Sequence, residues 1–166
     1  MENIYQQYDN VLETVKQYDK KATNLSKVFI ENHYAYSMKI YQNKIFENLV
    51  QRSDNITITN ASSIYKTLYN ICILSINYLE SFKDVDKNTI MEENRLLFQQ
   101  KNKDYGNSFE DYELIGILVR LNDKLNRILS ITENNDNIQV SNEKLEDTIN
   151  DLYNYCIIGL MYKPSY

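Results

Sequence analysis

The chain has 166 residues, a length that suits one domain with a single hydrophobic core. Glycine occurs at three positions and proline at one, so the residues that strands and tight turns require are scarce, and we expect an all-α bundle of about five to six helices. The net charge is −5 and the lysines are scattered among acids, which argues against duplex nucleic acid or an anionic membrane as a partner.

The first ten residues, MENIYQQYDN, lack the basic and then apolar order of a signal peptide. The longest apolar runs are too short to cross a bilayer. We therefore expect a cytoplasmic protein. Cys72 and Cys156 stand in apolar runs without the spacing of a metal site, which predicts free, buried thiols rather than a disulfide.

The hydrophobic pattern predicts six helices. In chain order they cover residues 5–33, 37–51, 61–82, 87–103, 110–131 and 142–162. The segments RSDNITITN (52–60) and ITENNDNIQVSN (131–142) are predicted as loops, because their Asn, Asp, Ser and Thr side chains compete with helical hydrogen bonds.

Two of these helices resemble each other. LYNICILSINYL (68–79) matches LYNYCIIGLMY (152–162), with Cys72 opposite Cys156. One interpretation is an internal duplication within a single all-α domain over 1–166, in which residues 1–84 are a decayed copy of the motif-bearing residues 93–162. The alternative is chance similarity in a biased alphabet. Without gaps, three acids of the second copy (Glu143, Asp147, Asp151) fall opposite Thr59, Ser63 and Thr67 of the first.

The segment KDYGNSF (103–109) predicts a bend before the fifth helix. Gly106 can adopt a positive φ, Asp104 favours a turn, and Ser108 is a candidate N-cap. Tyr105 is placed to stack on a base and Lys103 to meet a phosphate. The alternative is that both residues simply pack beside a turn.

The helix predicted over 110–131 has two chemically different sides. Its apolar stripe consists of Leu114, Ile117, Leu121, Leu125 and Ile128. Arg120, Asp123 and Arg127 share the other side, flanked by Lys124, in a pattern that suits a phosphate clamp. A surface ladder of ion pairs is the alternative.

The last helix carries Glu143, Asp147 and Asp151 at spacings of four, which places them on one stripe. Like charges at this spacing repel by a few tenths of a kcal/mol per pair. The helix becomes apolar all round after Asp151, which predicts that the acids lie at the rim of a packed interior. Together with Asp123 they are hard oxygen ligands of the kind that Mg²⁺ or Mn²⁺ prefers. The alternative is a solvated face.

Three ordered motifs carry a resemblance to a known family. KNKDYGNSF, LVRLNDKLNR and EKLEDTINDLYNY resemble the K-x-x-DYG-x-SF, R-x-x-DK-x-NR and E-x-x-x-DT-x-x-D-x-x-NY motifs of the nucleotide-modification-associated domain family of phage and bacterial proteins. The resemblance covers roughly residues 95–162. That family is similar in turn to the MazG-like all-α nucleoside triphosphate pyrophosphatases, including dimeric dUTPases, whose acidic helices hold Mg²⁺ around a triphosphate.

The resemblance implies a Mg²⁺- or Mn²⁺-dependent hydrolase that converts a (deoxy)nucleoside triphosphate, with a natural or modified base, to monophosphate and pyrophosphate. The expected metal ligands are Asp123, Glu143, Asp147 and Asp151. The expected catalytic residues are Asp123, Lys124 and Arg127. The expected substrate contacts are Lys103, Asp104, Tyr105, Arg120 and Asn154.

The MazG-like pattern E-E-x-x-E followed by E-x-x-D is absent from the chain, which leaves the metal count and the activity itself open. One alternative is a protein that binds or sequesters nucleotides without turnover. Another is an all-α interaction protein, viral or phage-borne, that uses its tyrosine-rich helices as an interface. A homodimer is left open, and a phage or viral protein would act in the host cytoplasm.

Overall fold

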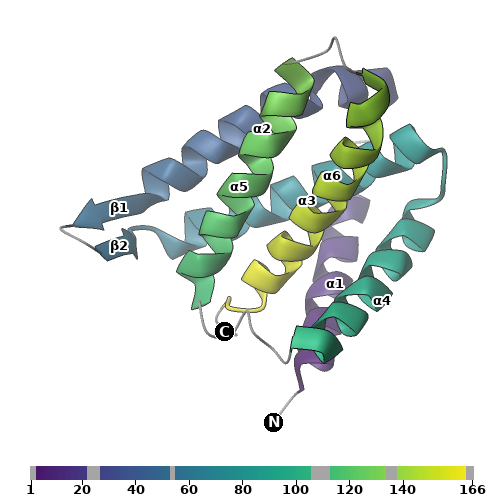
Figure 1. Cartoon of the computed structure of the whole chain (residues 1–166). Coiled ribbons are helices and arrows are strands. Elements are labelled where there is room, and N and C mark those ends of the chain that lie inside the picture. Colours follow the sequence, from purple (N-terminus) through teal and green to yellow (C-terminus); the bar gives the residue numbers. More distant parts are fainter. Residues whose placement is uncertain (1–2, 22–26, 53–54, 106–112, 134–137, 164–166) are drawn as a thin grey trace.

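The described part of the chain folds into six helices and one β-hairpin (Figure 1). The computed structural model describes residues 3–21, 27–52, 55–105, 113–133 and 138–163. In chain order the elements are α1 (Ile4–Lys21), α2 (Lys27–Asn48), β1 (Leu49–Arg52), β2 (Asn55–Ile58), α3 (Ala61–Lys83), α4 (Lys87–Tyr105), α5 (Glu113–Glu133) and α6 (Ile138–Leu160). The predicted all-α bundle is confirmed, with the hairpin as an addition.

The predicted first helix, over 5–33, is wrong. α1 ends at Lys21 and α2 begins at Lys27, continuing through the predicted break at 34–36 as far as Asn48. Residues 22–26, between these two helices, lie outside the described residues. The segment NHYAYSM contains no glycine or proline to end a helix.

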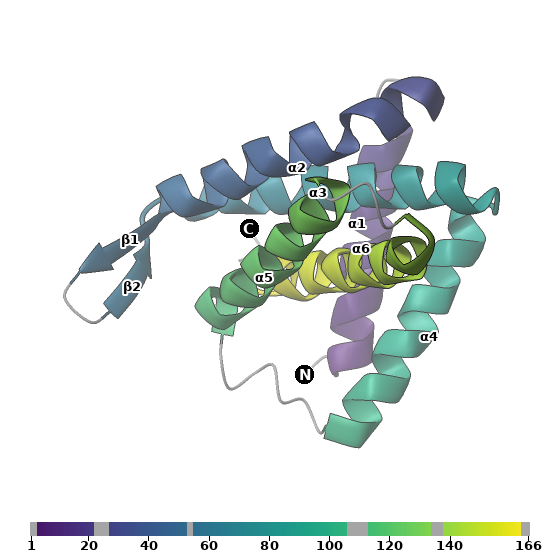
Figure 2. The ribbon, with the colours of Figure 1, turned by 45° about the horizontal axis from the view of Figure 1, so that its top comes forward.

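Part of the segment 52–60, predicted as a loop, forms a strand. β1 and β2 pair antiparallel, with Leu49 opposite Ile58 and Arg52 opposite Asn55. Val50, Ile56 and Thr57 are β-branched residues, which suit a pleated strand. The hairpin projects from the end of α2 and the start of α3, away from α1 and α4 (Figures 1 and 2).

The core lies between two helical hairpins. α2 packs on α3, α5 packs on α6, and the pairs meet through α3 against α6 and α2 against α5, while α1 and α4 cover one end (Figure 2). Cys72 on α3 and Cys156 on α6 are fully buried and free, as predicted. At Gly159 a Cβ atom would come within 2.9 Å of the Leu68 Cδ1 atom, so α6 approaches α3 closely. Within the described residues, no helix is long and apolar enough to span a membrane.

Within the described residues each half of the chain contains three helices. The helices at corresponding positions of the two halves have similar lengths. α1, α2 and α3 have 18, 22 and 23 residues, and α4, α5 and α6 have 19, 21 and 23. An internal duplication would produce such an arrangement, but the duplication itself stays a prediction.

A short connector joins the halves. It follows a left-handed C-cap at Asp84, whose N–H bonds the Glu80 carbonyl, and the Glu80 carboxylate accepts a 2.7 Å hydrogen bond from the Lys87 N–H.

Candidate functional site

The two sides of α5 are placed as the sequence predicts. The whole apolar stripe from Leu114 to Ile128 is buried. Arg120, Asp123 and Arg127 are exposed. Lys124 is partly buried, because its side chain reaches toward α6. The polar side of α5 therefore borders the helix that carries the predicted acids.

Along α6 the environment changes within one turn. The Asp147 side chain is exposed and the Asp151 side chain is 31% exposed, whereas Leu152, Tyr153 and Asn154 are buried. Asp151 thus lies where the solvated part of α6 meets its buried part. The side chain of Glu143 lies outside the described residues.

Three charged side chains from three helices meet at Asp151. One carboxylate oxygen lies 3.2 Å from the Lys124 Nζ atom on α5, and the other lies 3.5 Å from the Lys101 Nζ atom on α4. We call Lys101, Lys124 and Asp151 the Asp151 junction. Because all three side chains keep some exposure to water, an anionic ligand from solution can compete with the carboxylate for both ammonium groups.

Lys101 was not among the predicted site residues. It is the first lysine of the motif KNKDYGNSF, so a signal was present in the sequence. Its neighbour Lys103 is exposed near the end of α4. The side chains of Asp104 and Tyr105 lie outside the described residues, so their predicted contacts remain predictions.

A second ion-pair group lies further toward the start of α6. The Lys83 Nζ atom at the end of α3 is 2.9 Å from Glu146 and 3.8 Å from Glu93 on α4. The hydrogen bond that the Lys83 ammonium donates to the Glu146 carboxylate raises the pKa of Lys83, and Asp147 contributes a weaker electrostatic effect in the same direction. This lysine holds α3, α4 and α6 together beside the predicted metal ligand Asp147.

Asn154, a predicted substrate contact, is buried and bonded within the core. Its Oδ1 atom accepts a 2.6 Å hydrogen bond from the Tyr8 hydroxyl, and its Nδ2 atom donates to the Asn94 carbonyl over 3.3 Å. Both polar ends of the amide therefore have partners from α1 and α4.

Two asparagines of the α5 motif, Asn122 and Asn126, accept hydrogen bonds from α2. The Gln42 Nε2 atom on α2 donates to Asn122 Oδ1 over 3.0 Å and to Asn126 Oδ1 over 2.7 Å. Gln42 itself is buried. The motif DKLNR therefore combines Lys124, which reaches the Asp151 junction, with Asn126, which joins α5 to α2.

The described side chains do not form a metal cage by themselves. Among them no three His, Cys, Asp or Glu residues lie close enough together to hold a metal ion. Both oxygens of Asp151 face ammonium groups. Mg²⁺, however, is commonly held by one or two carboxylates together with substrate phosphates. That Asp147 and Asp151 hold a cation stays a prediction.

The Asp151 junction and the three motifs occupy one continuous part of the chain. Residues 101–162 match the family model of nucleotide modification associated domain 1. The match indicates a nucleotide-modification-associated domain over the end of α4, α5 and α6, in agreement with the predicted resemblance. It covers a little over a third of the chain and contains every predicted site residue. No curated protein and no solved structure matches the chain. The relation to MazG-like pyrophosphatases stays a prediction.

Proposed function

We propose that the segment 101–162 binds a (deoxy)nucleoside triphosphate at the Asp151 junction and hydrolyses it to monophosphate and pyrophosphate with the help of Mg²⁺ or Mn²⁺. One observation carries the proposal: ammonium groups from two different helices converge on a single, partly exposed carboxylate. The name of the matched domain, which refers to nucleotide modification, supports a nucleotide as the ligand.

The two lysines would bind the phosphates. Lys101 and Lys124 already lie 3.5 and 3.2 Å from Asp151, so each can turn from the carboxylate to a phosphate oxygen. Arg120 and Arg127 share the exposed side of α5 with Asp123 and would offset the charge that develops on the phosphates.

Asp147 and Asp151 would hold the cation, with Asp123 and Glu143 as the further predicted ligands. A bound Mg²⁺ would supply Lewis-acid activation of the phosphate and a more acidic water. In the overall reaction, the oxygen of water bonds to the α-phosphorus and the bond from that phosphorus to the oxygen bridging the α- and β-phosphates breaks. The protons of water end on the products or in solvent.

The test is incubation of natural and base-modified deoxynucleoside triphosphates with Mg²⁺ or Mn²⁺, followed by anion-exchange separation of the products. Monophosphate and pyrophosphate are expected. Asp147→Asn should abolish their formation, whereas Glu47→Gln, which changes an exposed acid on α2, should not. Equal turnover by the parent chain and Asp147→Asn would overturn the assignment of Asp147.

A second candidate function is nucleotide binding without turnover. The observation in its favour is that both oxygens of Asp151 are paired with lysines, which leaves fewer oxygens for a metal. Calorimetry followed by recovery of the nucleotide distinguishes the two functions. Binding without turnover predicts saturable triphosphate binding that depends on Lys101 and Lys124, and the nucleotide is then recovered intact.

A further inference from the structure

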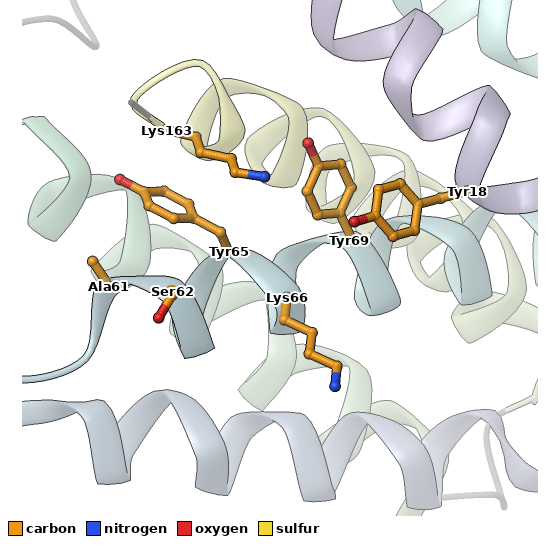
Figure 3. A pocket seen from close by; sticks show the side chains of 7 residues that line it. All are labelled: Tyr18, Ala61, Ser62, Tyr65, Lys66, Tyr69 and Lys163. Atoms are coloured by element: carbon orange, nitrogen blue, oxygen red, sulfur yellow. The ribbon is translucent and has the colours of Figure 1, made fainter. Parts of the chain in front are cut away.

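A pocket of about 290 Å³ opens at the start of α3 (Figure 3), and none of its lining residues belongs to the Asp151 junction. Residues from three parts of the chain line it: Tyr18 on α1, several residues of the first three turns of α3, and Lys163 just beyond α6. No lining residue belongs to the matched segment 101–162. The pocket is therefore separate in sequence from the proposed nucleotide site.

Tyrosine rings form the walls. Tyr65 and Tyr69 are one helical turn apart on α3, and Figure 3 shows their rings on either side of a gap. The position of both rings is fixed, because the Tyr65 hydroxyl donates a 3.1 Å hydrogen bond to the Tyr162 carbonyl and Tyr69 stacks on Tyr18 with ring centroids 4.5 Å apart. Such walls suit a flat ring.

The charge at the pocket is positive. The Lys163 ammonium reaches across the gap and lies 5.2 Å from the Tyr69 ring centroid, a cation–π contact. Lys66 is also among the lining residues, but its side chain points away from the gap between the two rings (Figure 3). Among the described residues, neither lysine has a carboxylate partner. Ser62, in the first turn of α3, also lines the pocket, so the positive end of the helix dipole adds to this charge.

We propose that this pocket binds a small ligand consisting of an aromatic ring with an attached anionic group. The ring would enter between Tyr65 and Tyr69 and replace the Lys163 ammonium against the Tyr69 face. Lys163 would then pair with the anionic group at the mouth, with Lys66 adding a weaker, more distant attraction. The volume lies near the lower end of the range for small-molecule sites, which suits one ring with a phosphate or carboxylate.

Calorimetry with the full chain tests the combination of ring and charge. Phenyl phosphate and benzoate carry both features, inorganic phosphate carries the charge alone, and phenol carries the ring alone. The proposal expects at least one of the first two to bind much more tightly than phosphate or phenol. Comparison of phenyl phosphate with benzoate distinguishes a phosphate ligand from a carboxylate ligand. The proposal would be overturned if neither phenyl phosphate nor benzoate bound, or if both bound no more tightly than inorganic phosphate and phenol.

Substitutions locate the binding. Lys163→Met should weaken it about tenfold or more, the loss expected for one charge-assisted hydrogen bond, and Lys66→Met should weaken it less. The matched control is Lys39→Met, which removes an exposed lysine of α2 that belongs neither to this pocket nor to the Asp151 junction and should leave phenyl phosphate binding unchanged.

Lys163→Met should leave triphosphate turnover unchanged. A result against ligand binding in this pocket can therefore be distinguished from a result against triphosphate hydrolysis at the Asp151 junction. Unchanged phenyl phosphate affinity in both Lys163→Met and Lys66→Met would show that the ligand does not occupy this pocket. Both lysines are exposed, and circular dichroism would verify the fold of each variant.

Discussion

The hydroxyl of Tyr8 on α1 donates a hydrogen bond of 2.6 Å to the amide oxygen of Asn154 on α6, 146 residues later in the chain. The Tyr8 ring also stacks on Phe98 of α4, with ring centroids 4.5 Å apart. Through these contacts α1 closes the end of the bundle against both α4 and α6. The nearby Tyr153 differs, because its hydroxyl is buried and has no hydrogen-bond partner among the described residues.

This difference predicts opposite effects of the same substitution. Tyr8→Phe should lower the free energy of unfolding by about 1–2 kcal/mol, because the buried Asn154 oxygen loses its donor. Tyr153→Phe should be neutral or raise the free energy by up to about 1 kcal/mol, because it removes a buried hydroxyl without a partner. Urea unfolding followed by circular dichroism measures both. Equal destabilisation by the two variants would contradict the hydrogen-bond assignment.

Asp151→Asn should separate nucleotide binding from turnover. Removal of the carboxylate frees Lys101 and Lys124 and removes a negative charge beside the phosphates, so triphosphate affinity without metal should rise severalfold. Turnover with Mg²⁺ should fall strongly, because a proposed metal ligand is lost. Calorimetry with EDTA and product analysis with Mg²⁺ give the two values. Weaker metal-free binding in this variant would show that the lysines do not bind phosphate.

The ion pair between Lys87 and Asp19 should contribute to stability. The Lys87 Nζ atom lies 2.6 Å from Asp19 Oδ2, and the Asp19 side chain is only 9% exposed. Lys87→Met should cost about 1–3 kcal/mol, because it leaves a largely buried carboxylate without its counter-charge. Lys16→Met is the control, since Lys16 pairs with the well-exposed Glu13, and it should change stability by less than about 0.5 kcal/mol. A similar loss of stability in both variants would show that the burial of Asp19 does not make its ion pair more important than the exposed one.

Stability should fall at alkaline pH. Burial raises the pKa of the Cys72 and Cys156 thiols above their ordinary value of 9.0. The unfolded chain therefore releases these protons near pH 9 while the native chain keeps them, so the stabilisation is complete below pH 9 and is lost as the pH rises above it. Each thiol contributes a slope of up to about 1.4 kcal/mol per pH unit.

Urea unfolding between pH 7 and pH 10.5 would measure this slope. In Cys72→Ala one of the two thiol contributions is removed, so the fall just above pH 9 should be shallower than in the parent chain. At higher pH the buried Tyr34 adds to the effect in both chains, because burial also raises the pKa of its hydroxyl. A slope unchanged by Cys72→Ala would mean that the thiol ionises as readily in the native chain as in the unfolded one.

The helices of the second half follow closely from the sequence. The predicted ranges 87–103, 110–131 and 142–162 correspond to α4, α5 and α6 with shifts of a few residues, because each has a clear apolar stripe between polar segments. The division between α1 and α2 was missed because the hydrophobic pattern continues across it. The hairpin was missed because its strands have only four residues each. Residues 49–51 of β1 fall at the end of the helix predicted over 37–51, and β2 lies in the polar segment 52–60 that was predicted as a loop.

The site was predictable only in part. Which face of α5 is polar follows from spacing, as does the stripe of acids on α6. Spacing does not reveal which residues of neighbouring helices contact one another, because these contacts depend on how α4, α5 and α6 pack. Lys101 at Asp151 and Lys83 at Glu146 are two such contacts. The same holds for Asn154, whose position one helical turn after Asp151 gave no indication of its hydrogen bond with Tyr8.

The chemical difference between α3 and α6 bears on stoichiometry. α6 carries Asp147 and Asp151, whereas the aligned positions of α3 are Ser63 and Thr67, and Thr67 is buried. A protein assembled from two identical acidic halves would present a pair of equivalent sites. This chain has the acids on one half alone, so saturation at the Asp151 junction should be hyperbolic, with one equivalent of nucleotide per polypeptide and no cooperativity within the molecule.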